Sequence, residues 1–234
     1  MTETAYNGEP AQSRTSAALV EFLTFTTFGL AGVCFYWYSQ SGAIALLLLG
    51  WVTFGTAFDF LSHVLGLYFS RHEEFLRWYA RINFAALCFG IPFTALAGSF
   101  VIADVAPDGI NAQVVAYWRP ILFASLAFGS LFLFARYRQF THAGAVEFTL
   151  EKSHRYTRTI FWARRAYLAL ALLVGIAVII EGFGTTWALW AAAFGLTFIA
   201  TVPLHIMHKQ IPSMLSEAIT LYILAYGSWA MFVA

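Results

Sequence analysis

The chain has 234 residues, of which 60% are apolar and only 11% are charged, and its mean hydropathy is +0.71. A water-soluble domain carries about 25% charged residues to cover its surface, and disorder requires low hydrophobicity, so this composition excludes a soluble globule and a disordered chain. The net charge of +1 produces no field that would recruit nucleic acid. We therefore expect an all-α integral membrane protein with no nucleic-acid partner.

The chain divides into a short polar start and one long apolar domain. Residues 1–16 predict a mobile N-terminal tail, and residues 17–234 predict a single transmembrane domain. About 20 apolar residues in a helix cross the hydrocarbon core while satisfying their own backbone hydrogen bonds. Seven stretches reach this length and predict a polytopic bundle of seven transmembrane helices, at residues 19–38, 42–69, 79–103, 118–136, 163–181, 186–207 and 213–233.

Two connections between the predicted helices are long. Residues 104–119 contain a Pro-Asp-Gly turn signal at 107–109. Residues 136–165 form a basic segment that we predict to be cytoplasmic, and from Ala145 onward it contains neither Gly nor Pro. Polar side chains recur there at the spacing of one helical face, at Glu147, Glu151, His154 and Arg158. We expect the fifth helix to begin in this segment and to run continuously into the membrane.

The distribution of basic residues predicts the orientation of the bundle. Lys and Arg accumulate in short cytoplasmic loops. Only Arg119 falls on one side of the predicted helices, so we expect a cytoplasmic N-terminus, an external C-terminus and a location in the cell inner membrane. The other twelve basic residues share the opposite side: Arg14, Arg71, Arg77, Arg81, Arg136, Arg138, Lys152, Arg155, Arg158, Arg164, Arg165 and Lys209.

Ionisable and imidazole groups gather at the cytoplasmic boundary of three predicted helices. Asp59 and His63 are four residues apart, His205 and His208 are three apart, and Glu217 lies one turn into the last helix. Each intramembrane ionisable group costs about 2.5–3.5 kcal/mol on insertion scales, so such a cluster predicts a functional site in the inner leaflet.

A metal site is the first interpretation of this cluster. His63, His205 and His208 are predicted to bind Zn or Fe, and Asp59 is predicted to be a further ligand or a general base. A metal-bound water would then be activated for hydrolysis. A structural alternative is that Asp59 and His63 pair with each other or with Asn83. The metal interpretation predicts a membrane-embedded, metal-assisted enzyme of lipid metabolism.

The predicted partner of this enzyme is a membrane lipid or isoprenoid. Aromatic residues make up 18% of the chain, which suits an isoprenoid pocket, although Phe also suits contact with lipid. Arg164, Arg165 and Lys209 lie at the same boundary and are predicted to hold an anionic substrate head group. Anchoring by positive residues at the cytoplasmic face explains these three equally well.

A second interpretation uses carboxyl groups alone. Asp59 and Glu217 could face each other across the bundle, and a buried carboxyl group keeps its proton at neutral pH. Such a group would be a general acid on an olefin or epoxide, and aromatic walls would stabilise carbocations. This alternative predicts a carboxylate-driven terpenoid cyclase, with Asp59 and Glu217 as the catalytic pair.

The remaining alternatives are not enzymes. His63 and His205 could be the axial ligands of a b-type haem in a haem- or pigment-binding subunit. A transporter could use Asp59, Glu181 and Glu217 along its path. A retinal Schiff base is excluded in mid-membrane, because the only lysines are at positions 152 and 209, both at the inner surface.

Overall fold

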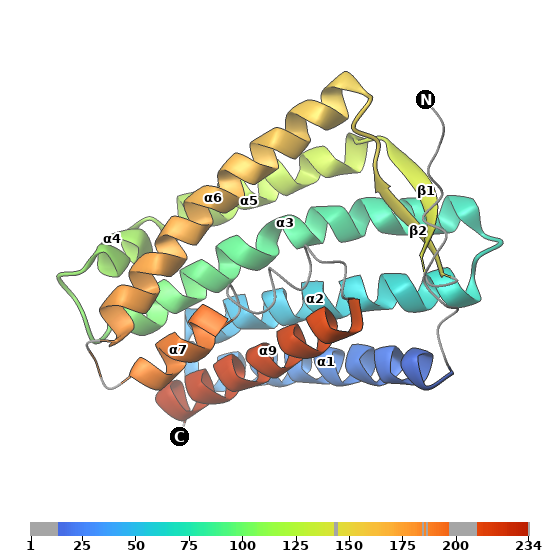
Figure 1. The fold of residues 1–234 in the computed structure, drawn as a ribbon. Helices are drawn as coiled ribbons and strands as arrows, with labels where there is room; N and C mark the ends of the chain where they lie inside the picture. Colours follow the sequence, from blue (N-terminus) through green and yellow to red (C-terminus); the bar gives the residue numbers. More distant parts are fainter. Residues whose placement is uncertain (1–13, 143–144, 184, 186, 197–209, 234) are drawn as a thin grey trace.

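The computed structural model describes residues 14–142, 145–183, 185, 187–196 and 210–233, and it is mostly helical (Figure 1). The described elements in chain order are α1 (Arg14–Ser41), α2 (Ile44–Tyr68), α3 (Glu73–Ala103), α4 (Ile110–Ala116), α5 (Trp118–Ser130), the 3₁₀ turn η1 (Leu131–Phe134), β1 (Tyr137–His142), β2 (Ala145–Leu150), α6 (Arg155–Phe183), α7 (Ala188–Leu196) and α9 (Gln210–Phe232).

The long helix α3 runs through the middle of the bundle. It packs against α2 on one side and against α5 and α6 on the other, while α1 packs against α2 and α9. The main apolar core lies toward the end that carries α7, where Leu49, Leu96, Phe194 and Leu224 are buried together. The strands β1 and β2 lie at the opposite end, where α2 ends and α3 begins (Figure 1).

Four helices are long and apolar enough to cross a membrane: α1 from Ala17 onward, α2, α3 and α6. A fifth span results if α4 and the α5–η1 stretch, which are bent by 68° relative to each other, count as one. The predicted sixth span extends beyond α7 into residues 197–207, which lie outside the described residues, and the predicted seventh falls within α9 and the residue that follows it, Val233. The number seven and the orientation stay predictions.

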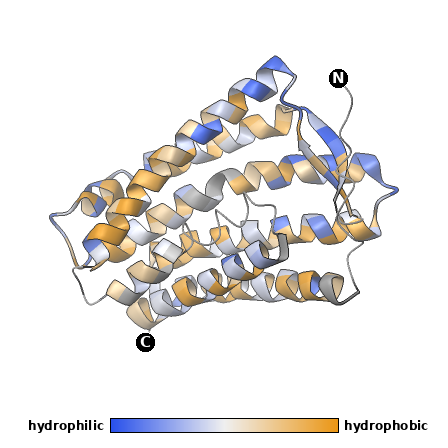
Figure 2. Cartoon of the chain, in the orientation of Figure 1, coloured by the Kyte–Doolittle hydropathy of each residue, from blue (hydrophilic) through white to orange (hydrophobic). Residues whose placement is uncertain are grey.

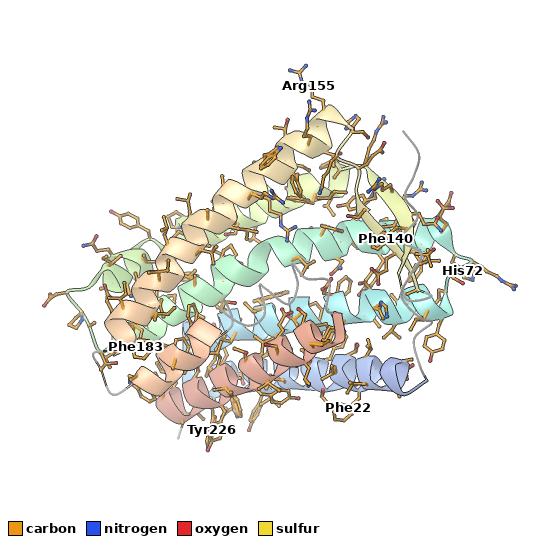
Figure 3. The ribbon with its side chains drawn as sticks, viewed as in Figure 1. Phe22, His72, Phe140, Arg155, Phe183 and Tyr226 are labelled. Atoms are coloured by element: carbon orange, nitrogen blue, oxygen red, sulfur yellow. The ribbon has the colours of Figure 1, made fainter. Side chains whose placement is uncertain are left out.

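Large apolar side chains cover the outer surface of the bundle. On α1, Phe22 and Phe25 are 63% and 74% exposed, and on α6, Leu173 and Ile180 are 62% and 69% exposed. Phe22 and Tyr226 stand on the outer faces of α1 and α9 (Figure 3), and hydrophilic residues gather at the hairpin end (Figure 2). Soluble proteins rarely expose apolar patches of this extent, so the surface indicates a membrane protein.

The prediction that a helix begins near Ala145 is wrong for its first residues, because this region forms a β-hairpin. β1 and β2 pair antiparallel, from Tyr137 opposite Leu150 to His142 opposite Ala145, and α6 begins only at Arg155. Apolar residues at every second position of β2 carry the strand periodicity. The charges spaced at helical intervals concealed it, since both periods fit a segment this short.

The hairpin packs closely onto the bundle. Buried side chains of β1 and β2, including Tyr137 and Phe148, join Leu76 of α3 and Ile160 of α6 in one apolar cluster. On α2, a Cβ atom at Gly66 would overlap the backbone carbonyl of Val146. Only a glycine therefore allows the strand to approach α2 this closely.

The predicted loop at residues 104–119 is partly helical. The turn at residues 104–109 is present, and α4 follows it. The carboxylate of Glu181, at the end of α6, accepts hydrogen bonds from the backbone N–H groups of Ile110 (2.7 Å) and Asn111 (3.3 Å) and from the Asn111 side chain (2.7 Å). This cap for the first turn of α4 comes from about 70 residues away in the chain, which is why the local sequence did not predict the helix.

Candidate functional site

A cavity of about 550 Å³ lies at the hairpin end of the bundle. Its wall is formed by α2, α3, both strands, the start of α6 and the start of α9. Four residues predicted to be functional line this one cavity: Asp59, Arg164, Arg165 and Glu217. The structure therefore brings together the predicted catalytic acids and two of the three predicted head-group residues.

These residues share one level of the bundle because three helices have the same charge pattern. Each contains 15 residues without Asp, Glu, Lys, Arg or His, at 44–58 in α2, 166–180 in α6 and 218–232 in α9. At 1.5 Å per residue each stretch is about 22 Å long. Asp59, Arg165 and Glu217 bound these stretches on the hairpin side. The three charge-free stretches together form a layer of the bundle, called here the charge-free slab, and the cavity lies at its edge on the hairpin side.

The two predicted catalytic acids are each held by a neutral donor on a neighbouring helix. The side-chain amide of Asn83 on α3 donates to Oδ1 of Asp59 at 2.7 Å. The hydroxyl of Thr56 on α2 donates to Oε1 of Glu217 at 2.9 Å. Pairing of Asp59 with Asn83, the structural alternative to a functional role, is therefore present. Both acids have a fixed orientation and still line the cavity, as proton transfer to a bound molecule requires.

His63 is buried behind the cavity and is bonded to the hairpin. Its Nδ1 donates to Oε1 of Glu147 on β2 at 2.5 Å, and the two side chains are 1% and 19% exposed. Glu147 also lines the cavity. Glu147 falls in the predicted helix, so this pair was not predicted. The alternation of Val146, Phe148 and Leu150 was a strand signal, and it places Glu147 on the opposite face of the strand, but it does not identify His63 as the partner.

Basic side chains occupy another part of the cavity wall. The Nζ atom of Lys152 lies 4.4 Å from the centre of the Phe161 ring, and the guanidinium carbon of Arg165 lies 4.5 Å from the same centre. Next to them, Nε of Arg164 is buried and has no hydrogen-bond partner within the described part of the chain. Lys152 lies in the turn between β2 and α6 and was not among the predicted head-group residues.

Three of the predicted site residues, His205, His208 and Lys209, lie outside the described residues. The shared metal site and the haem site both depend on His205, so neither is tested by the geometry. Within the described ranges, no three His, Cys, Asp or Glu side chains are grouped to hold a metal ion. Glu181, proposed for a transport path, caps α4 at the far end of α6 and is absent from the cavity wall.

Comparison with known proteins finds no protein family that matches the chain and no curated protein sequence that resembles it. The proposal of function therefore rests on the cavity and on the groups that line it.

Proposed function

We propose that the chain is a membrane-embedded enzyme that acts on a lipid or isoprenoid at the cytoplasmic face, with Asp59 and Glu217 transferring protons. The observation that carries this proposal is that two oriented carboxyl groups from different helices line one cavity with apolar and aromatic side chains. Two positioned acids are what a reaction needs when it adds a proton at one atom and removes one at another.

The site's level in the bundle supports a lipid substrate. A charge-free stretch of about 22 Å on each of three helices corresponds to a large part of a hydrocarbon core of about 30 Å. The cavity at its edge would then open near the lipid head groups, with the tail of a substrate toward Phe60 and Phe84. The basic residues of the hairpin and of the α2–α3 connection favour a cytoplasmic position for this end of the bundle. The proposed bundle has seven transmembrane spans.

The proposal is tested by the lipid content of cells that express the protein. Compared with cells expressing the double variant Asp59→Asn/Glu217→Gln, cells expressing the unmodified protein should show one depleted lipid and one accumulated product in untargeted mass spectrometry. Glu74→Gln is the matched control, because Glu74 is exposed at the start of α3 and does not line the cavity. Identical lipid profiles for the unmodified protein and the double variant would contradict an enzymatic role.

Metal assistance is a second candidate, and the His63–Glu147 hydrogen bond favours it. A histidine that donates from Nδ1 to a carboxylate keeps the lone pair of its neutral ring on Nε2, which is the common arrangement of metal-binding histidines. His205 and His208 would complete the ligand set. We expect about one equivalent of zinc or iron in the purified protein and its loss in His63→Gln, with His72→Gln as the control at an exposed position. Full lipid conversion by metal-free protein would exclude this candidate.

A further inference from the structure

The strongest unexplained feature of the cavity is its concentration of positive charge. Lys152 and Arg165 approach the same aromatic ring, and Arg164 is the neighbour of Arg165 on α6. Within the residues that the structure describes, none of these three cations forms a salt bridge. Like charges that line one cavity repel each other, and the repulsion grows where water is displaced. An anion bound between them would remove this cost.

Arg164 adds an unsatisfied donor to this positive wall; Arg77 and Arg81 have the same unsatisfied Nε, but neither residue lines the cavity. The Nε of Arg164 is buried, and no acceptor in the described ranges reaches it. Buried polar groups of native proteins nearly always have a hydrogen-bond partner, and a guanidinium donates most strongly to carboxylate or phosphate oxygens. An acceptor supplied by a ligand would satisfy this donor.

Within the described residues, no acid of the same cavity forms an ion pair with these cations. Asp59 accepts from Asn83, Glu217 accepts from Thr56, and Glu147 accepts from His63, so each has a donor from the wall behind or beside it. The acidic groups lie on α2, β2 and α9, whereas the basic groups lie on α6 and in the turn before it. A ligand that contacts both the acidic and the basic groups needs a strongly anionic end, and the rest of the molecule must be neutral or apolar.

We infer that Lys152, Arg164 and Arg165 form a binding site for the phosphate of an amphiphile, an inference that rests on the lipid site proposed above. The guanidinium of Arg165 also lies 4.9 Å from the Trp162 ring centre, and stacking on two rings reduces the rotamer entropy lost on binding. Arg165 bounds the charge-free stretch of α6 on the hairpin side, where a lipid head group would lie in the orientation proposed above. A phosphate ester there would place its tail along the apolar wall formed by Phe60, Leu76, Phe84, Leu87 and Met214.

Two classes of amphiphile have the required phosphate group and apolar tail: isoprenyl diphosphates, and phospholipids such as phosphatidic acid. The purified full chain, in nanodiscs of phosphatidylcholine, is titrated with farnesyl diphosphate, farnesol, phosphatidic acid and diacylglycerol. We expect one of the two phosphate-bearing ligands to bind at least about tenfold more tightly than its neutral counterpart. The tighter of the two identifies the source, and its affinity should fall as ionic strength rises.

Variants assign the binding to the basic wall. Lys152→Ala and Arg165→Ala should each weaken binding of the phosphate ligand about tenfold and leave binding of its neutral counterpart unchanged, while Lys152→Arg should retain most of the affinity. Arg155→Ala and Arg158→Ala remove the same charge from exposed positions of α6 outside the cavity (Figure 3 shows Arg155 at the helix tip), and they should change the affinity less than twofold.

Three results would overturn the inference: equal affinity for the phosphate and neutral ligands, no binding of either, or equal losses in the cavity and control variants. These outcomes are separable from failure of the proposed function. If the neutral ligand binds as well and the lipid profile still depends on Asp59 and Glu217, the enzyme acts on a neutral lipid. If phosphate binding depends on Lys152 and Arg165 but the lipid profile ignores Asp59 and Glu217, the cavity binds a lipid without converting it.

Discussion

Glu147→Ala should lower the free energy of unfolding by about 2 kcal/mol, which is the usual cost of leaving a buried hydrogen-bond donor without its charged acceptor. His63 is 1% exposed and donates to Glu147 at 2.5 Å, so the substitution removes the acceptor of a buried ring nitrogen. The loss should also release the hairpin from α2, because His63 and Gly66 lie on the same face of α2, where β2 contacts it. Unfolding in nanodiscs, followed by circular dichroism, measures the first effect, and tryptic cleavage after Arg138 measures the second.

The glutamate of an exposed ion pair provides the control. Glu73 and Arg77 are one helical turn apart on α3, and their side chains are 50% and 43% exposed. Glu73→Ala should cost less than about 1 kcal/mol, because solvent screens such pairs. Replacing both His63 and Glu147 with Leu should recover most of the stability lost in Glu147→Ala. Equal stability of Glu147→Ala and Glu73→Ala would show that the buried pair does not hold the hairpin.

The sequence predicted where along the helices the site lies better than it predicted which residues line it. Because an ionisable group within hydrocarbon is costly, the ends of the charge-free stretches mark where such groups can lie, and this placed Asp59 and Glu217 at one boundary without any knowledge of the packing. The positions of Arg164 and Arg165 followed in the same way. The long apolar helices α1, α2, α3 and α6 follow from the same composition and fall where they were predicted.

The sequence failed where long-range contacts decided local structure. Residues 145–150 satisfy both a helical and a strand period, and the strand forms because its apolar side chains enter a cluster built by α3, η1 and α6. The cap of α4 by Glu181 is likewise supplied from outside the segment. Glu147 and Lys152 were therefore not predicted as site residues, since their roles depend on how the hairpin and its following turn lie on the bundle.

Single neutral substitutions of the two acids should separate catalysis from binding. We expect Asp59→Asn and Glu217→Gln each to lower kcat by about 10²–10⁴-fold, the range lost when a general acid or base is removed, with little change in KM. Each substitution preserves the geometry. The Asn side-chain oxygen at position 59 can still accept from Asn83, and the Gln oxygen at position 217 can still accept from Thr56. Only the ability of the carboxyl group to transfer a proton is lost, so the effect should appear in kcat.

The basic wall should show the opposite kinetic pattern. Arg165→Ala removes a group that contacts the substrate equally before and during the reaction, so KM should rise about tenfold while kcat changes little. Initial rates of conversion of the lipid found by the profiling experiment, measured in nanodiscs across substrate concentrations, give both parameters for all three variants. A loss in kcat for Arg165→Ala as large as that for Asp59→Asn would mean that the cation acts on the transition state. A kcat unchanged in both Asp59→Asn and Glu217→Gln would remove proton transfer from the mechanism and leave these carboxyl groups as structural hydrogen-bond acceptors.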